Sequence, residues 1–359
     1  MPWDKEKTAA LLSEIGELVS GEIRLMEVCG THTMSIAEAG IKSMLPKEVK
    51  LLSGPGCPVC VTPPQVIDAV LELSMERDVI LTSYGDMLRV PGSKAGDSLL
   101  RRKALGAQVE TVYSPVDAVE LALREPDKQV VFLGVGFETT APGTAAAVLT
   151  AQEKGAKNFS LWSMLKLVEP ALRTLIRMDG FNVDGFLCPG HVATIIGADG
   201  FAFLPKEYGL PAVVAGFEPE DILLAVYRLI KQLHDRQPRL ENEYTRAVSQ
   251  SGNLLAQNII KQCFEARFDV WRGLGGIEAS GLGLRDELKD FDAERRFQIK
   301  YLSSEPPTAC RCGEVITGRL SPELCPMFGK VCTPEDPVGP CMVSSEGACA
   351  AAWKYAGIQ

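Results

Sequence analysis

The sequence predicts an α/β protein that has two parallel-sheet domains and a cysteine-rich C-terminal segment. One observation is a recurring pattern: a short apolar run ends in a small-residue turn, and a helical stretch follows. Such alternation is typical of parallel sheets covered by helices. A second observation is the length of 359 residues, which is more than a single domain with one hydrophobic core usually contains. The third is that six of the 11 cysteines fall within 310–349.

The elements follow this pattern along the chain. Residues 4–19 are expected to form an amphipathic helix, because Leu11, Ile15 and Leu18 have helical spacing. Strands are expected at 23–28, 49–52, 79–82, 130–135, 185–187 and 212–215. Helices are expected at 35–39, at 64–75, after GFETTAPG through residue 151, and over DILLAVYRLI.

These elements predict two α/β domains, at 20–120 and 125–235, joined around the segment ALREPDK. Residues 241–359, together with helix 4–19, are expected to form a third unit, which is helical and carries the cysteine-rich tail. Its first part is helical and Gly-rich, and its tail begins after SSEPPTA, where two prolines break any helix. Because the tail lacks the apolar patterning of a core, a bound metal is expected to stabilise it.

Composition narrows the class of protein. The net charge of −9 argues against nucleic-acid binding. No run reaches the ~18 apolar residues of a membrane span, and the start MPWDKEKTAALL lacks a secretory signal. A cytoplasmic location is therefore expected. In that compartment, clustered cysteines more often bind metal or perform chemistry than form structural disulfides.

Cys29 lies at a predicted strand end, where open α/β sheets bind ligands. It follows the run IRLMEV and precedes a helix, and a helix N-terminus is expected to lower the pKa of its thiol. His32, three residues later, is a candidate second ligand or base. A buried cysteine with a hydrogen-bonded histidine explains the turn CGTHT equally well.

The CxxC in GPGCPVC, formed by Cys57 and Cys60, is more specific. Its spacing suits a dithiol or two ligands to one metal. A thioredoxin-like site needs the pair at the start of a helix, but VTPPQ intervenes. A zinc knuckle needs a second such pair nearby, and two packed cysteines in a Gly-Pro turn need no function. A site shared with Cys29 also remains open.

Other turns carry polar residues. His191 lies in CPGHV, again after an apolar run. GVGFETT fails the dinucleotide fingerprint, because Thr139 occupies the third glycine position. In SYGDMLRVPG, Asp86 and Arg89 either orient a polar ligand or pair with each other. Cys263 reads as a core cysteine on a helix.

The tail CRCGEVITGRLSPELCPMFGKVCTPEDPVGPCMVSSEGAC holds six cysteines and no histidine, which favours thiolate-only ligation. Zinc sites usually show two close CxxC pairs, and none is present here. Iron–sulfur clusters use four thiolates and often have a proline after a ligand. Composition therefore favours an iron–sulfur cluster, with zinc or metal-free redox thiols as alternatives.

Seven motifs in this order, spanning about residues 24–355, resemble the HypD family of hydrogenase maturation factors. They are CGTHT, GPGCPVCVTP, YGDMLRVPG, GFETTAPGT, CPGHVATIIG, WRGLG and CTPEDPVGPCMVSSEGACAA. The resemblance implies a metallocentre assembly factor with redox activity rather than a conventional metabolic enzyme. It implies a stable complex with HypC, on which the iron of [NiFe]-hydrogenases receives two cyanides and one carbon monoxide. Cyanide would come from the C-terminal thiocyanate of HypE, which HypF helps to make.

The resemblance also implies roles for individual residues. The family's reactive cysteines match Cys29, Cys57 and Cys60, its motif histidines match His32 and His191, and an acidic position matches Glu346. The family's [4Fe-4S] ligands match Cys310, Cys325, Cys332 and Cys349. The remaining tail cysteines, Cys312 and Cys341, are candidates for a redox-active pair beside the cluster.

Soft iron that carries cyanide and carbon monoxide suits thiolate ligands. A cluster supplies single electrons, and a dithiol supplies two on becoming a disulfide. Our hypothesis is that electrons pass from the cluster through the Cys312/Cys341 pair and then the CxxC dithiol to iron near Cys29. The alternatives are an iron–sulfur dithiol/disulfide reductase acting on a protein, and a zinc-stabilised binding module.

Overall fold

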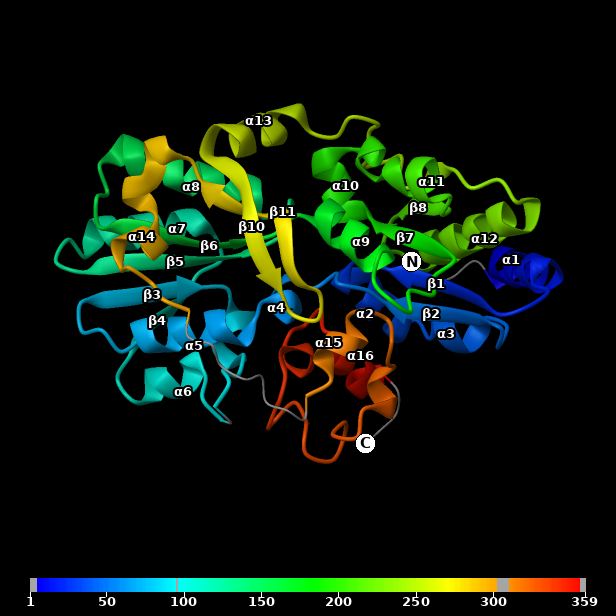
Figure 1. The fold of residues 1–359 in the computed structure, drawn as a ribbon, viewed down its shortest axis with the longest axis horizontal. Coiled ribbons are helices and arrows are strands. Elements are labelled where there is room, and N and C mark those ends of the chain that lie inside the picture. The colour runs from blue at the N-terminus through cyan, green and yellow to red at the C-terminus, as the bar shows by residue number, and fades with distance from the viewer. Residues whose placement is uncertain (1–4, 95, 302–309, 356–359) are drawn as a thin grey trace.

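Two parallel sheets and a cysteine-rich C-terminal segment make up the fold. The computed structural model describes residues 5–94, 96–301 and 310–355. Figure 1 shows the two sheets side by side, with the C-terminal segment below the region where they meet. The predicted α/β class, with two parallel sheets and a separate cysteine-rich segment, is therefore confirmed.

The first sheet has five parallel strands in the order β2-β1-β7-β8-β9. They are β1 (Ile23–Glu27), β2 (Val49–Ser53), β7 (Gly185–Pro189), β8 (Ala212–Ala215) and β9 (Leu240–Asn242). The long helix α12 (Pro219–Asp235) packs against β8 and β7. It buries Ile222, Val226 and Leu229, which share one face because they are spaced by three or four residues.

The second sheet has four parallel strands in the order β4-β3-β5-β6. They are β3 (Val79–Ser83), β4 (Gln108–Thr111), β5 (Gln129–Gly136) and β6 (Phe159–Leu165). β6 is buried at every residue and β5 at all but its first. Helices on the faces of a parallel sheet explain such continuous apolar runs.

The remaining helices connect and cover these strands. They are α1 (Lys5–Leu18), α2 (Gly30–Glu38), α3 (Ile41–Met44), α4 (Pro58–Val61), α5 (Pro64–Leu73), α6 (Leu99–Ala104), α7 (Pro115–Arg124), α8 (Ala141–Lys154), α9 (Val168–Ile176), α10 (Gly190–Ile196), α11 (Phe203–Tyr208), α13 (Leu254–Cys263), α14 (Ala293–Arg296), α15 (Cys312–Val315) and α16 (Ala348–Tyr355). The predicted helices correspond to α1, α2, α5, α8 and α12. Cys263 is buried at the end of α13, as predicted.

The sheets do not follow the predicted ranges 20–120 and 125–235. β3 and β4 lie in the first range but share a sheet with β5 and β6, whereas β7 and β8 extend the sheet of β1 and β2. The segment ALREPDK joins α7 to β5 within the second sheet and marks no boundary between sheets. Parallel partners are separated by long crossovers, so local patterns do not reveal which strands pair.

Two further expectations about 241–359 are corrected. Helix α1 packs against α12 of the first sheet layer, where Ile15 is fully buried, and does not join the cysteine-rich unit. The Gly-rich stretch, expected to be helical, forms an antiparallel hairpin of β10 (Phe264–Trp271) and β11 (Gly275–Leu284). Glycines at positive φ in its turn, Gly273 and Gly275, allow the chain to reverse there.

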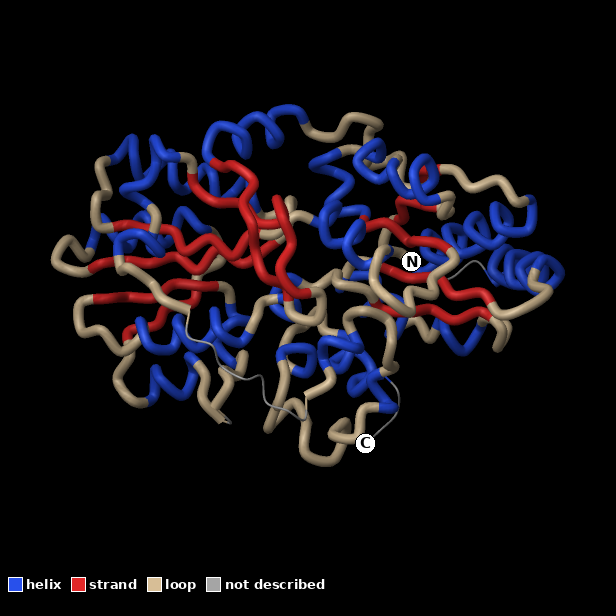
Figure 2. The backbone as a smooth tube through the Cα atoms, in the orientation of Figure 1, coloured by secondary structure: helices blue, strands red, loops and turns tan. Residues whose placement is uncertain are grey.

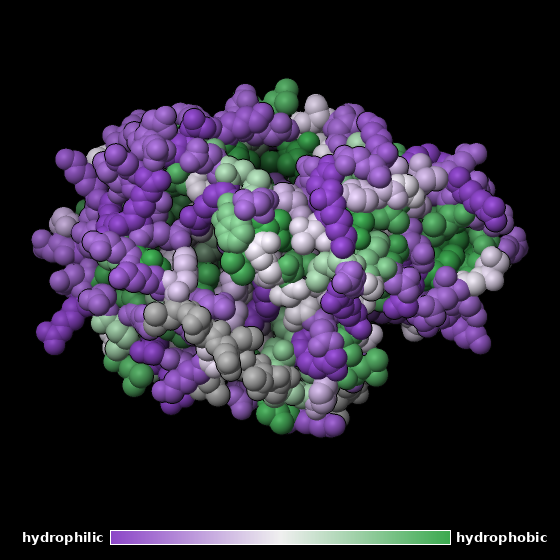
Figure 3. Space-filling model, in the orientation of Figure 1, coloured by the Kyte–Doolittle hydropathy of each residue, from purple (hydrophilic) through white to green (hydrophobic). Residues whose placement is uncertain are grey.

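The C-terminal segment from 310 to 355 consists mainly of loops and short helices, as Figure 2 shows. It lies against both sheet layers through α2 and α4. Figure 3 shows hydrophilic residues over the left and upper edges of the molecule and less polar residues around its centre. Within the described residues, none of the helices is both long and apolar enough to cross a bilayer.

Candidate functional site

Cys29 lies between the end of β1 and the start of α2, with extended backbone at φ −148° and ψ 122°. The loop GPG packs directly against it. The Gly30 N–H donates to the Gly56 carbonyl at 3.0 Å. A Cβ on Gly56 would lie 2.3 Å from the Cys29 nitrogen, so only glycine permits this approach. The loop thereby brings the CxxC to the Cys29 turn.

The CxxC pair is a buried disulfide, with Cys57 5% and Cys60 0% exposed. The expectation that VTPPQ separates the pair from a helix start is wrong, because the one-turn helix α4 begins at Pro58. The Cys57 sulfur caps this turn by accepting from the Cys60 N–H at 3.1 Å. The Ser344 hydroxyl of the C-terminal segment lies 3.4 Å from the same sulfur. The pair therefore lies between the Cys29 turn and the C-terminal segment.

Glu346 reaches the Cys29 turn from the C-terminal segment. The Thr31 hydroxyl donates to its carboxylate at 3.1 Å. A Cβ on Gly30 would lie 2.3 Å from the Glu346 Cβ, so this glycine also permits a close approach. Chain segments more than 300 residues apart in sequence thus meet here. The structure brings Cys29, the CxxC and Glu346 together.

The turn SYGDMLRVPG holds the C-terminal segment in place. Asp86 accepts hydrogen bonds from the Ser345 backbone N–H at 2.9 Å and from its hydroxyl at 2.8 Å. Arg89 donates to the carbonyl of Pro334. Of the two alternatives for Asp86 and Arg89, the ion pair between them is absent from the described structure, and both side chains instead bind the C-terminal segment.

The Cys29 thiol is not activated by its helix. Burial raises its pKa to about 12, and the nearby Glu346 and Glu27 carboxylates act in the same direction. The backbone N–H groups of Thr31 and His32 act in the opposite direction but do not compensate. The predicted lowering of the pKa is therefore wrong, because desolvation of the thiolate exceeds the favourable effect of the helix N-terminus. A bound metal cation would deprotonate such a thiol.

Two histidines flank an aromatic ring beside this turn. Phe217 packs against His32 with ring centroids 4.8 Å apart and against His191 at 3.9 Å. His32 is fully buried and its Nε2–H donates to the Gly216 carbonyl at 2.8 Å, while its Nδ1 has no hydrogen-bond partner among the described residues. Burial lowers the pKa of His32 to about 4 and also lowers that of His191. Both imidazoles are therefore neutral at physiological pH.

Sequence reasoning missed Phe217 and Glu27. The Glu27 carboxylate accepts from the Cys29 N–H at 3.0 Å and from the Thr33 hydroxyl at 2.5 Å. It is 3% exposed, and burial raises its pKa to about 7. It also lines a cavity of about 280 Å³ between α2, β2 and α16. The signal in the sequence was a lone acidic residue at the end of the apolar run IRLMEV.

All six tail cysteines line one apolar cavity of about 20 Å³. They are Cys310, Cys312, Cys325, Cys332, Cys341 and Cys349. The Cys312 thiol forms hydrogen bonds with the Cys310 thiol and with the Cys341 thiol. The Cys341 thiol also contacts the Cys349 thiol. Hydrogen bonds from the Cys310 and Cys341 thiols hold the pKa of Cys312 well below its usual range. The four proposed ligands and the proposed redox pair, whose thiols are free in this structure, thus meet at one place.

The donor chemistry of this cavity fits an iron–sulfur cluster. Its lining consists of the six soft thiols, Arg311 and mainly apolar residues that include Val315, Met327 and Phe328. In the described ranges, no three His, Cys, Asp or Glu side chains converge on the position of a single metal ion. A cluster is larger than one ion and separates its ligands more widely. Four thiolates hold one cluster, so the six thiols here supply enough ligands for that group.

A buried carboxyl in GFETTAPG predicts a pH-dependent stability. Glu138 is 5% exposed; one oxygen accepts from the Val168 N–H at 2.9 Å, and the other has no hydrogen-bond partner among the described residues. Burial raises its pKa from 4.5 to about 7. The folded state therefore binds the Glu138 proton more tightly than the unfolded state does. The stability that this bound proton contributes is lost as the pH rises from about 4.5 to about 7.

We therefore expect Glu138→Gln to raise the free energy of unfolding by about 3 kcal/mol at about pH 8, relative to the natural chain. At about pH 4 the two proteins should be nearly equally stable, because the carboxyl is then protonated in both states. Urea unfolding at both pH values measures the difference. The exposed Glu120→Gln is the control and should show no such dependence. An equal effect of Glu138→Gln at both pH values would contradict the assignment.

Comparison with known proteins gives a consistent result over nearly the whole chain. A family model described as "HypD: Hydrogenase formation hypA family" matches residues 6–356. Hydrogenase maturation factor HypD2 of Bradyrhizobium diazoefficiens is 45% identical over 339 residues, covering 92% of this chain and 89% of that protein. Hydrogenase maturation factor HypD of Azotobacter vinelandii is 46% identical over 340 residues, with 93% and 89% covered. The HypD of Escherichia coli K12 is 44% identical over 334 residues, again with 93% and 89% covered.

Proposed function

The chain belongs to the HypD family of hydrogenase maturation factors, and from this premise we propose that it is the scaffold on which hydrogenase iron receives its diatomic ligands. The observation that carries the proposal is the convergence of three thiol sets. Cys29 and the CxxC meet through the GPG loop, and the segment with the six tail cysteines contacts both through Ser344 and Glu346. Iron binding and reduction can thus occur within one continuous site.

Cys29 is proposed as the protein's ligand to the substrate iron. Its thiol keeps its proton in the absence of a metal, because burial and two carboxylates disfavour the thiolate. Iron binding would displace that proton, which the nearby Glu27 or Glu346 carboxylate can accept. The neutral His32 and His191 are proposed as hydrogen-bonding groups toward the diatomic ligands. A soft thiolate suits iron that carries cyanide and carbon monoxide.

The CxxC is proposed as the reductant in cyanide transfer. Cleavage of the S–CN bond of the HypE thiocyanate needs two electrons and yields a thiolate and cyanide. The Cys57 and Cys60 dithiol can supply both electrons as its S–S bond forms, and it releases two protons. The pair is in the disulfide form in this structure, which is the oxidised product of that step. Each turnover would therefore require its reduction.

We propose that the C-terminal cysteines supply the electrons that reduce the Cys57–Cys60 disulfide. Cys310, Cys325, Cys332 and Cys349 would hold a [4Fe-4S] cluster, which supplies electrons one at a time when bound. The neighbouring thiols of Cys312 and Cys341 are hydrogen-bonded to each other, so they can form a second redox pair. We propose HypC as the stable partner, HypE, with HypF upstream, as the cyanide source, and the cytoplasm as the location.

The proposal predicts the effect of removing the reductant. We expect Cys57→Ala and Cys60→Ala each to lower the iron–cyanide infrared bands of the complex with HypC at least tenfold. The visible absorption of the tail cluster should persist, because α4 contributes none of its ligands. Infrared and visible spectra of anaerobically purified complexes measure both quantities. Undiminished cyanide bands would remove the CxxC from the mechanism.

The alternative functions give different results in the same preparation. A dithiol/disulfide reductase acting on a protein is favoured by the buried disulfide beside six thiols, but it would show no bound cyanide or carbon monoxide. A zinc-stabilised binding module would contain zinc in place of iron. Metal analysis should give about four iron atoms per chain from one cluster, plus any substrate iron, and no zinc.

A further inference from the structure

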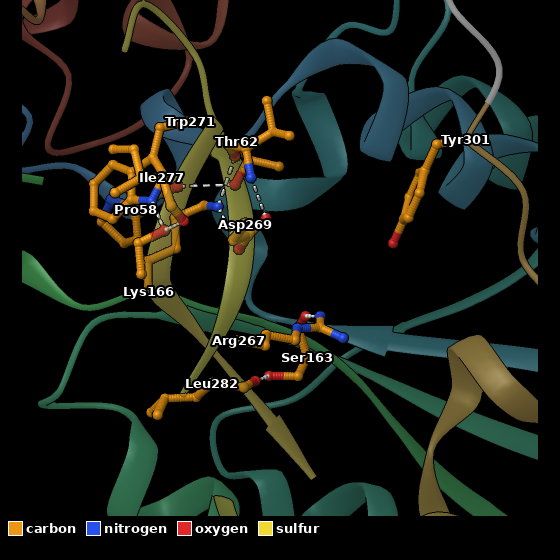
Figure 4. Close-up of polar contacts among 12 residues, drawn as sticks. Pro58, Thr62, Ser163, Lys166, Arg267, Asp269, Trp271, Ile277, Leu282 and Tyr301 are labelled. Atoms are coloured by element: carbon orange, nitrogen blue, oxygen red, sulfur yellow. Dashed lines mark hydrogen bonds and ion pairs between the residues drawn. The ribbon is translucent and has the colours of Figure 1, made fainter. Parts of the chain in front are cut away.

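Arg272 lies at the tip of the β10–β11 hairpin, in the motif WRGLG, to which the proposed function assigns no role. Figure 4 shows the preceding Trp271 beside Pro58 and Thr62 of the CxxC segment. The Trp271 ring stacks on Phe137 with centroids 5.9 Å apart, and its Nε1–H donates to the Ser280 hydroxyl at 3.0 Å. The Trp271 ring therefore packs the hairpin tip against the chain that follows β5.

Arg272 binds the end of the CxxC helix. Its backbone N–H donates to the Val61 carbonyl at 2.8 Å, and its Nε–H donates to the Thr62 carbonyl at 3.1 Å. The last carbonyls of a helix have no partners within the helix and need donors from elsewhere. One residue thus satisfies two carbonyls directly after Cys60 and fixes the C-terminal end of α4.

The hairpin tip that carries Arg272 also touches the cysteine-rich segment. A Cβ on Gly273 would lie 2.7 Å from the carbonyl oxygen of Gly313, so the hairpin tip touches the backbone next to Cys312. Arg272 directly precedes Gly273, so its backbone lies at this contact. Its Nη2 is buried and has no hydrogen-bond partner among the described residues. None of the ion pairs in those residues includes Arg272, so no carboxylate neutralises its charge.

We propose that Arg272 is a positioning residue that couples the two thiol centres: it fixes the end of the CxxC helix and places a permanent positive charge beside the tail cysteines. The inference rests on the proposed function, because it takes Cys310 as a cluster ligand. Reduction of a cluster adds one electron, breaks no bond and needs no proton. A nearby cation stabilises the added negative charge, most strongly where water is excluded. Arg272 therefore makes the tail easier to reduce.

Arg272→Met tests the charge, because methionine has similar reach and no charge. At any set potential, we expect the ratio of reduced to oxidised cluster in this variant to be at least tenfold lower than in the natural chain. For a one-electron couple this equals a potential lower by about 59 mV. The measurement is a redox titration of the full chain with dithionite as electron donor, followed by electron paramagnetic resonance. Arg272→Lys keeps the charge and should stay within about threefold of the natural ratio.

Arg311→Met is the matched control. Arg311 lies between Cys310 and Cys312 in sequence, but its side chain is 42% exposed and forms an ion pair with Glu314. Water and the carboxylate screen its charge, so its removal should change the ratio much less. If Arg272→Met does not fold, Arg272→Gln repeats the measurement with a neutral side chain that keeps a donor. An unchanged ratio for the neutral variants, or an equal change for Arg311→Met, would overturn the inference.

The same titration separates the two proposals. A natural chain without cluster absorption would overturn the proposed cofactor, and the inference with it. A natural chain with a normal cluster, together with neutral Arg272 variants of unaltered potential, would overturn the role of Arg272 alone.

Discussion

Cys29→Ala is expected to abolish the infrared bands of iron-bound cyanide and carbon monoxide in the complex with HypC, and to leave the visible absorption of the tail cluster unchanged. Cys29 lies outside the cavity that the six tail cysteines line. Its turn contacts the C-terminal segment through Glu346, whose hydrogen bond comes from Thr31 and does not involve the Cys29 thiol. The substitution therefore removes the proposed iron ligand without removing this contact.

The control is Cys263→Ala, which removes another buried thiol. The Cys263 side chain is fully buried in the second sheet layer beside α8, where its thiol lies 3.7 Å from the Ala145 carbonyl. It should keep both the infrared bands and the cluster absorption. Loss of both signals in Cys29→Ala, with both retained in the control, would show that Cys29 has a structural role. Retained infrared bands in Cys29→Ala would assign the iron to another ligand.

Asp269→Ala is expected to destabilise the protein by about 3–5 kcal/mol, because it leaves a buried ammonium group without its counter-ion. Lys166 is 1% exposed, and its Nζ donates to the Asp269 carboxylate at 2.7 Å and to the Val270 carbonyl at 2.9 Å. Figure 4 shows this pair between the β10 strand and the chain that follows β6. It ties the hairpin to the second sheet, near a register shift between Arg267 and Asp269.

Urea unfolding of the anaerobically purified chain measures the loss. The control is Asp78→Ala, which breaks the ion pair with Lys128, where the Asp78 side chain is 81% exposed. Such exposed pairs contribute about 0–1 kcal/mol. The double variant Lys166→Met with Asp269→Leu should recover much of the stability, because it removes both charges. A loss for Asp269→Ala no larger than that of the control would contradict the assignment.

The local patterns predicted most of the first sheet's strands and the main helices. The strand predicted at 212–215 coincides with β8, and those at 23–28 and 49–52 with β1 and β2 within one residue at each end. These segments are short, apolar and bounded by turn residues, so their signal is local. The hairpin β10–β11 was missed, although FEARFDVW alternates in part between apolar and polar residues. This stretch is expected from its sequence to be helical and Gly-rich, whereas its glycines lie in the turn and in β11.

The candidate site was predicted in part. The motifs indicated that Cys29 and the CxxC share a strand edge, and the structure brings them together through Gly56. Glu27 was read as part of an apolar run, since its hydrogen bonds to Cys29 and Thr33 arise only in the folded turn. Phe217 had no visible role, because His32 and His191 approach it from helices about 160 residues apart. Arg272 was named only within a motif.

The sequence by itself determined the α/β class, the positions of the reactive turns, the number of thiols and the family. Each of these depends on residue type and spacing along the chain. Only the tertiary structure decided which strands share a sheet, that α1 packs on α12, and that Arg272 binds the end of the CxxC helix. It also decided that burial raises the pKa of the Cys29 thiol. These properties depend on contacts between distant segments and on exclusion of water, which no local pattern encodes.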